Sequence, residues 1–370
     1  MRLYSCICGN TLFFENSRCL ACAREVGWCP ACRAIRALEP ADAGCWRCAE
    51  PACGALLAKC VNYAREDVCN RCVLADGLAP DAGPLCDCCR FNATIPDLSV
   101  PGNREKWARI ERAKRRLFYI LDGLGLPYGT SAEGFDPPLA FDFKGDTVPA
   151  GGICHSMGET EQVYTGHAEG KITINIREAD GAEREKLRVN FGEAQRTVIG
   201  HFRHEMAHYF WDLLIRGRRE DAFRAVFGDH EKPPYAEALE RHYREGPPEG
   251  WRERHISAYA TMHPWEDWAE TFAFYLDVAS VLETAANMRL LEAVPWEELD
   301  AMLARFHGIG LMVNEINRTM GLIDLVPEVI TPAVEAKLRF VHEVVRAAVA
   351  GRAGVSPDPP GSPTAQAAAP

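Results

Sequence analysis

Cysteine is confined almost entirely to the first quarter of this 370-residue chain. Fifteen of the 16 cysteines lie between Cys6 and Cys89, and only Cys154 lies beyond them. The N-terminus carries no apolar signal segment, so we expect a cytoplasmic location, where thiols stay reduced. So many reduced cysteines indicate metal binding rather than a disulfide framework. The sequence therefore predicts a zinc-thiolate module over residues 1–90 that requires metal to fold.

The first eight cysteines form two sets of closely spaced pairs. A closed tetrahedral zinc site needs four ligands, and two such pairs supply them. The spacing predicts one site from Cys6, Cys8, Cys19 and Cys22 and a second from Cys29, Cys32, Cys45 and Cys48. The remaining cysteines suffice for a third site, but spacing alone does not assign them. We therefore expect two or three structural zinc ions in tandem zinc ribbons.

Charge argues against some classes of partner. The chain has a formal net charge of −11, which disfavours binding to nucleic acid or to an anionic membrane. Residues 1–90 hold equal numbers of basic and acidic side chains, and zinc-bound thiolates add further negative charge. No run approaches 18 apolar residues, so we expect no membrane span. A protein partner is the better expectation for the ribbon module.

Residues 204–208 read His-Glu-Met-Ala-His. Two histidines at positions i and i+4 lie on one face of a helix, where both imidazoles can reach one zinc ion. Glu205 lies beside that face, where its carboxylate can take a proton from a zinc-bound water. The pattern is typical of zinc hydrolases. It predicts His204 and His208 as ligands of a catalytic zinc and Glu205 as the general base.

The third zinc ligand has to lie further along the chain. The motif does not continue with the Gly and His that metzincins place next, so a carboxylate is expected, as in gluzincins. Glu266 is the best candidate, because Pro264 suits a first helical turn and Glu270 lies one turn further on the same face. Glu270 would then hydrogen-bond a ligand histidine and orient it. The other candidates for third ligand are Asp267, Glu270 and His263.

Tyr259 lies seven residues before Glu266. Some gluzincins place a tyrosine there, and its hydroxyl can stabilise the oxyanion that forms during hydrolysis. An amphipathic core tyrosine is an equally good interpretation.

The rest of the chain predicts an α+β protein. A mostly helical domain over residues 91–350 follows the ribbon module, and residues 351–370 form a disordered tail. Periodicity predicts helices near 103–121, 194–215, 235–244, 265–282, 296–319 and 332–349. Residues 171–176 alternate apolar and polar side chains and predict a strand, either in the core or as a substrate-binding edge strand. Residues 126–160 are rich in Gly and Pro and predict irregular structure.

Four strings in the chain resemble one bacterial family, the putative zinc-binding metallopeptidases with an N-terminal zinc-ribbon domain. They are residues 90–99, 165–176, 200–209 and 263–272. The resemblance implies a zincin-like catalytic domain with a gluzincin-type site, in which His204 and His208 are ligands and Glu205 is catalytic. It also implies a third cysteine set of Cys60, Cys69, Cys86 and Cys89, which leaves over Cys53, Cys72 and Cys88. The chain departs from the family near Phe274 and Asp277, where the family tends to have His.

These observations favour a zinc-dependent metallopeptidase that hydrolyses peptide bonds through a zinc-activated water, with Glu205 as general base. Its cofactors would be one catalytic zinc and the structural zinc ions, and its substrate a peptide or protein. One alternative is a non-catalytic zinc-binding scaffold for protein interaction. Another is a protease tethered to nucleic acid by its ribbons. The presence of Glu205 favours the peptidase, because a scaffold needs the histidine ligands but no general base.

Overall fold

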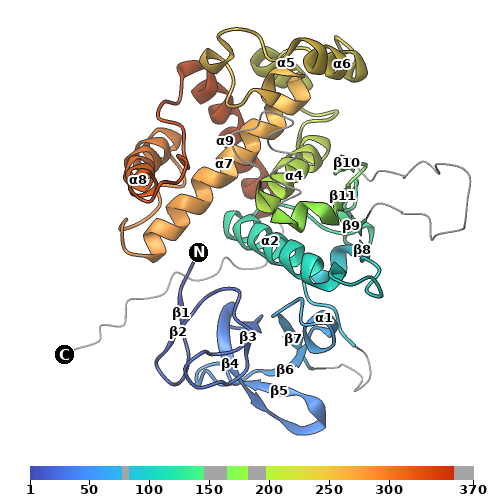
Figure 1. Cartoon of the computed structure of the whole chain (residues 1–370), viewed down its shortest axis with the longest axis vertical. Helices are drawn as coiled ribbons and strands as arrows, with labels where there is room; N and C mark the ends of the chain where they lie inside the picture. Colours follow the sequence, from blue (N-terminus) through green and yellow to red (C-terminus); the bar gives the residue numbers. More distant parts are fainter. Residues whose placement is uncertain (77–82, 146–164, 182–196, 354–370) are drawn as a thin grey trace, which may run out of the picture.

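The computed structural model describes residues 1–76, 83–145, 165–181 and 197–353 (Figure 1). Cys154 and the last 17 residues of the predicted disordered tail lie outside these ranges. Within them, no helix has the length and apolar character needed to cross a membrane. The predicted α+β class is confirmed: a cysteine-rich, strand-rich region precedes a mostly helical one.

The N-terminal region is built from short antiparallel strands. Strands β1 (Tyr4–Ser5) and β2 (Thr11–Leu12) form one pair. A five-stranded sheet has the order β3-β4-β5-β6-β7, with each strand paired to the next in sequence. Its strands are β3 (Val26–Cys29), β4 (Ala34–Pro40), β5 (Trp46–Cys48), β6 (Leu56–Lys59) and β7 (Cys72–Leu74), and the short helix α1 (Val61–Ala64) follows β6.

A second sheet lies in the C-terminal region and has the order β10-β11-β9-β8. Its strands are β8 (Asn92–Thr94), β9 (Ala140–Lys144), β10 (Gly166–Ala168) and β11 (Lys171–Asn175). The strand predicted over residues 171–176 is confirmed as β11, but its use as an edge strand is wrong, because β11 lies between β10 and β9. The irregular structure predicted for residues 126–160 is also wrong at β9, where Phe141 and Phe143 are buried.

The helices surround a common core and agree with the predicted pattern. They are α2 (Asn103–Leu124), α4 (Val198–Leu214), α5 (Glu220–Phe227), α6 (Tyr235–Glu245), α7 (Pro264–Asn287), α8 (Leu299–Thr319) and α9 (Pro332–Ala353). The six predicted helices are confirmed, and α5 is an additional short one. Helix α7 runs through the middle and packs against α4, α8 and α9 (Figure 1).

Helix α2 lies between the ribbon region and the rest of the molecule (Figure 1). Arg115 on α2 donates a hydrogen bond to the backbone oxygen of Val68, 2.7 Å away. Lys114 and Glu111, both fully buried, form an ion pair of 3.0 Å on the same helix. Buried cysteines of the ribbon region and the buried apolar face of α2 belong to one continuous core. The ribbons are therefore packed on the helical domain through a shared interior.

Candidate metal centres

Two helix starts bring the sequence-predicted ligands together. Helix α4 begins after Thr197, whose hydroxyl accepts a hydrogen bond from the backbone N–H of Gly200 at 3.0 Å. This start sets His204 and His208 one turn apart on α4. Helix α7 begins after His263, whose Nδ1 accepts a hydrogen bond from the backbone N–H of Trp265 at 3.1 Å. The first turns of α7 carry Glu266 and Glu270.

The nitrogen and oxygen atoms of three side chains converge at this crossing of α4 and α7. The Nε2 atoms of His204 and His208 lie 3.2 Å apart. One carboxylate oxygen of Glu266 lies 3.0 Å from Nε2 of His204, and the other lies 3.4 Å from Nε2 of His208. These three side chains form a group whose candidate ligand atoms all lie within 4.8 Å of one another. The other candidates, Asp267, Glu270 and His263, do not belong to it, so Glu266 is the carboxylate that lies against Nε2 of both histidines.

The donor set has the electronic character of a cation site. Nδ1 of His204 lies 2.6 Å from Oε1 of Glu270, whose carboxylate accepts a hydrogen bond from the Nδ1 proton, and in a neutral imidazole Nε2 then keeps a lone pair for a metal. That lone pair faces the carboxylate of Glu266. Burial raises the pKa of Glu266, but the adjacent His208 and His204 outweigh burial and hold it well below the ordinary value. Two imidazole nitrogens and a carboxylate oxygen that converge in this way are the donor set of a catalytic zinc site, so these residues fit a zinc ion.

Glu205 is buried beside the two histidines, with 7% of its surface exposed. Burial raises the pKa of its carboxyl group, although the neighbouring His204 and His208 act in the opposite direction. A carboxylate with a raised pKa beside a metal site is suited to proton transfer near neutral pH.

Two tyrosines complete the polar surroundings, and only one of them was predicted. Tyr259, in the 3-10 turn η6 (Tyr259–Thr261), has its ring centre 6.0 Å from that of His204. Tyr235, on α6, donates a hydrogen bond from its hydroxyl to Oε1 of Glu266 at 3.0 Å. Sequence reasoning missed Tyr235, because nothing in the local pattern of α6 relates it to Glu266.

The other acidic candidate on α7 has a different environment. Asp267 is buried and forms an ion pair with Lys337 of α9, with Nζ and Oδ2 2.5 Å apart. His255 approaches the same carboxylate at 3.7 Å. Asp267 therefore anchors α7 to α9, while Glu266, one residue earlier, faces α4.

Three groups of four cysteines lie in the ribbon region. The first and third are those predicted: Cys6, Cys8, Cys19 and Cys22, and then Cys60, Cys69, Cys86 and Cys89. The third group is fully buried and belongs to the core shared with α2. The leftover Cys72 and Cys88 are buried as well, but they belong to none of these groups.

The second group differs from the prediction in one member. The structure groups Cys29, Cys32 and Cys48 with Cys53 instead of Cys45. Sulfur atoms of Cys29 and Cys53 lie 3.8 Å apart, and those of Cys32 and Cys48 lie 3.7 Å apart. Cys45 precedes β5, whereas Cys48 ends it, so the length of the strand separates Cys45 from the sulfur atoms of the site. Cys53 reaches the site because the turn after β5 folds back. The backbone N–H of Cys53 donates a hydrogen bond to the backbone oxygen of Glu50 at 2.9 Å and closes this turn.

Comparison with known families decides the classification. Residues 103–344 match the family model described as putative zinc-binding metallo-peptidase. The chain belongs to this family. Residues 3–100 match a zinc-ribbon domain. The metallo-peptidase match covers His204, His208 and Glu266, and the zinc-ribbon match covers the three cysteine groups.

Relatives of the same overall length occur in mycobacteria. An uncharacterized protein of Mycobacterium bovis and one from each of two Mycobacterium tuberculosis strains, CDC 1551 and H37Rv, are 37% identical to this chain over 356 residues. The aligned region covers 93% of this chain and 95% of each relative. No solved structure matches the chain. The aligned region thus includes most of both the ribbon and the peptidase regions of this chain.

Proposed function

We propose that this chain is a zinc-dependent peptidase with its active site at the crossing of α4 and α7. The observation that carries the proposal is the convergence of His204, His208 and the ionised carboxylate of Glu266, with Glu205 buried beside them. A zinc ion held by these three residues would supply a Lewis acid that polarises a peptide carbonyl and lowers the pKa of water.

Glu205 is proposed as the general base. Its carboxylate takes the proton of the attacking water and then delivers it to the leaving amine. Burial serves this role, because it raises the pKa of the carboxyl group and lets the proton be held between the two steps.

Glu270, Tyr235 and Tyr259 are proposed as supporting groups. Glu270 fixes the tautomer of His204 through its 2.6 Å contact with Nδ1. Tyr235 holds Glu266 in place by its hydrogen bond to Oε1. The Tyr259 hydroxyl is the candidate donor to the oxygen that becomes negatively charged during hydrolysis, because the tyrosine ring lies beside His204.

The cysteine groups are proposed to hold three structural zinc ions, with Cys53 in the place predicted for Cys45. Thiolate sites of this kind suit a reducing compartment, so we propose a cytoplasmic location. The ribbon region is proposed to bind a protein partner, and the substrate is proposed to be a peptide or an unfolded protein.

The test is hydrolysis of fluorescently labelled casein by the zinc-loaded chain and its Glu205→Gln variant. Glu205→Gln should lower turnover by about 10²–10⁴-fold, because the general base is lost, and should leave the zinc content unchanged. Glu292→Gln, which changes an exposed carboxylate outside the site, is the matched control and should retain full activity. Undiminished hydrolysis by Glu205→Gln would contradict the proposed mechanism. A parent that binds zinc but cleaves no casein would instead support the scaffold alternative.

A further inference from the structure

The end of α8 and the segment after it expose an unusual number of apolar side chains. Among residues 311–329, Met320 is 71% exposed, Val329 70% and Leu322 62%. Ile316 and Ile323 are also more than half exposed. We call the exposed apolar side chains of residues 311–329 the α8 apolar surface. Helix α8 lies at the edge of the molecule and packs against α7 on its inner side (Figure 1).

This segment is folded back along α8 by its buried contacts. The side-chain amide of Asn314 donates to the backbone oxygen of Val326 at 2.9 Å and accepts from the backbone N–H of Leu325 at 2.8 Å. Val326 is the buried apolar side chain of the segment, and it packs directly on Gly310. A Cβ atom at Gly310 would come within 2.4 Å of Val326, so the glycine is required for this close packing.

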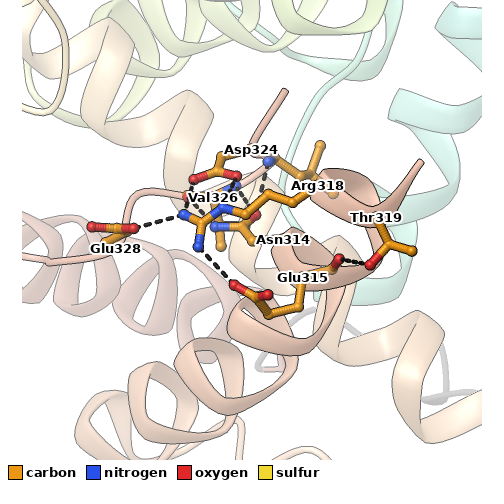
Figure 2. A network of polar contacts seen from close by, with 8 residues as sticks. Asn314, Glu315, Arg318, Thr319, Asp324, Val326 and Glu328 are labelled. Atoms are coloured by element: carbon orange, nitrogen blue, oxygen red, sulfur yellow. Dashed lines mark hydrogen bonds and ion pairs between the residues drawn. The ribbon is translucent and has the colours of Figure 1, made fainter. Parts of the chain in front are cut away.

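A charged network holds the rest of the segment in place (Figure 2). The guanidinium group of Arg318 contacts Glu315 at 2.7 Å, Asp324 at 2.5 Å and Glu328 at 2.6 Å. Arg318 thereby links the last turns of α8 to Asp324 and Glu328 of the segment that follows the helix. The polar groups are satisfied within the molecule, while the large apolar side chains remain in solvent.

Such an arrangement costs free energy unless a partner covers the surface. Burial of a large apolar side chain is favourable, and this gain is absent while the side chain stays in water. Contiguous exposed apolar surface is characteristic of interaction sites. The rigid segment also lowers the entropy cost of docking, because its backbone is already ordered.

The charges around the surface indicate the chemistry of the partner. Residues 311–329 carry three carboxylates and one guanidinium, which gives the surface a net charge of −2. The side chains of Glu315 and Glu328 are 70% and 65% exposed. A second copy of the chain would bring two negative surfaces together, and an anionic membrane would be repelled.

We propose that the α8 apolar surface binds an amphipathic segment of another protein, with apolar side chains flanked by Lys and Arg. The apolar side chains would pack on Ile316, Met320 and Ile323, and the basic groups would pair with Glu315 and Glu328. This docking site is separate from the catalytic residues, and the proposal holds whether or not the chain is a peptidase.

The test is a selection of random 16-residue peptides displayed on phage against the zinc-loaded full chain. The matched variant is Ile316→Ser/Ile323→Ser, which changes exposed side chains and should leave the fold intact. Leu20→Ser is the control, because Leu20 is 88% exposed in the ribbon region, remote in sequence from α8. The best peptide is then synthesised, and its affinity for each protein is measured by fluorescence anisotropy at two salt concentrations.

We expect enriched peptides in which apolar residues spaced by three or four alternate with Lys or Arg. The double variant should bind the synthesised peptide at least 10-fold more weakly, Leu20→Ser should bind it as the parent does, and higher salt should weaken the affinity. Absence of enrichment, enrichment of acidic peptides, or equal binding by the double variant would overturn the proposal. Sedimentation of the parent as a dimer that the double variant dissociates would also overturn it, since the occupant would then be a second copy.

Discussion

The Nδ1 atom of His204 lies 2.6 Å from Oε1 of Glu270. Glu266, one turn earlier on α7, faces Nε2 of the same ring. The imidazole is thus held between two glutamates of α7, and its two nitrogens have different roles. Nδ1 donates a hydrogen bond to Glu270, and Nε2 of the neutral ring can bind a metal.

Glu270→Gln is expected to weaken zinc binding at the proposed catalytic site by about 10–100-fold, because a neutral amide is a weaker hydrogen-bond acceptor for Nδ1 and no longer raises the basicity of His204. Competition with a fluorescent zinc chelator measures the affinity. Glu343→Gln, which changes an exposed carboxylate on α9, should bind zinc as the parent does. Equal affinities in the parent and the Glu270→Gln variant would show that Glu270 does not support the site.

The second cysteine group gives a direct comparison within the ribbon. Cys53→Ser should release one zinc ion per chain and lower the midpoint of thermal unfolding, because the site loses one of four ligands. Cys45→Ser should leave both unchanged, because Cys45 lies outside the group. Metal analysis of the two purified variants distinguishes them. Zinc loss from Cys45→Ser but not from Cys53→Ser would show that Cys45 is the fourth ligand, as the sequence spacing predicted.

His255 should make the stability of the protein depend on pH. Burial, together with the nearby Lys337, lowers the pKa of His255 to about 4 from an ordinary value of 6.5. The unfolded chain therefore binds a proton more tightly, so this contribution to stability is present above pH 6.5 and is lost as the pH falls toward 4. Urea unfolding of the parent and of His255→Gln between pH 4 and 7 should show a smaller pH dependence in the variant; parallel curves would rule out this role.

The sequence predicted the parts of the site that local geometry determines. The spacing of His204 and His208 fixes their common face on any helix, and Pro264 marks the start of the helix that carries Glu266 and Glu270. The structure brings these residues together as that pattern indicates. The six long helices were predicted for the same reason, since each carries a repeating apolar stripe.

Other features depend on contacts that spacing does not encode. Cys45 and Cys53 both lie near Cys48 in sequence, and the direction of β5 and the turn after it decide which one reaches the site. Tyr235 contacts Glu266 only because α6 packs beside the start of α7. Strand β9 is five residues long in a region rich in Gly and Pro, and it forms because its partners β8 and β11 pair with it.

We propose that His204, His208 and Glu266 bind a zinc ion separate from those of the three cysteine groups. The most direct measurement is the zinc content of the purified full chain and of its His204→Ala/His208→Ala variant, determined by atomic emission. We expect four zinc ions per parent chain, one for each group of candidate ligands, and three in the variant. Equal zinc contents in two folded proteins would contradict it, because the histidines would then not form a metal site.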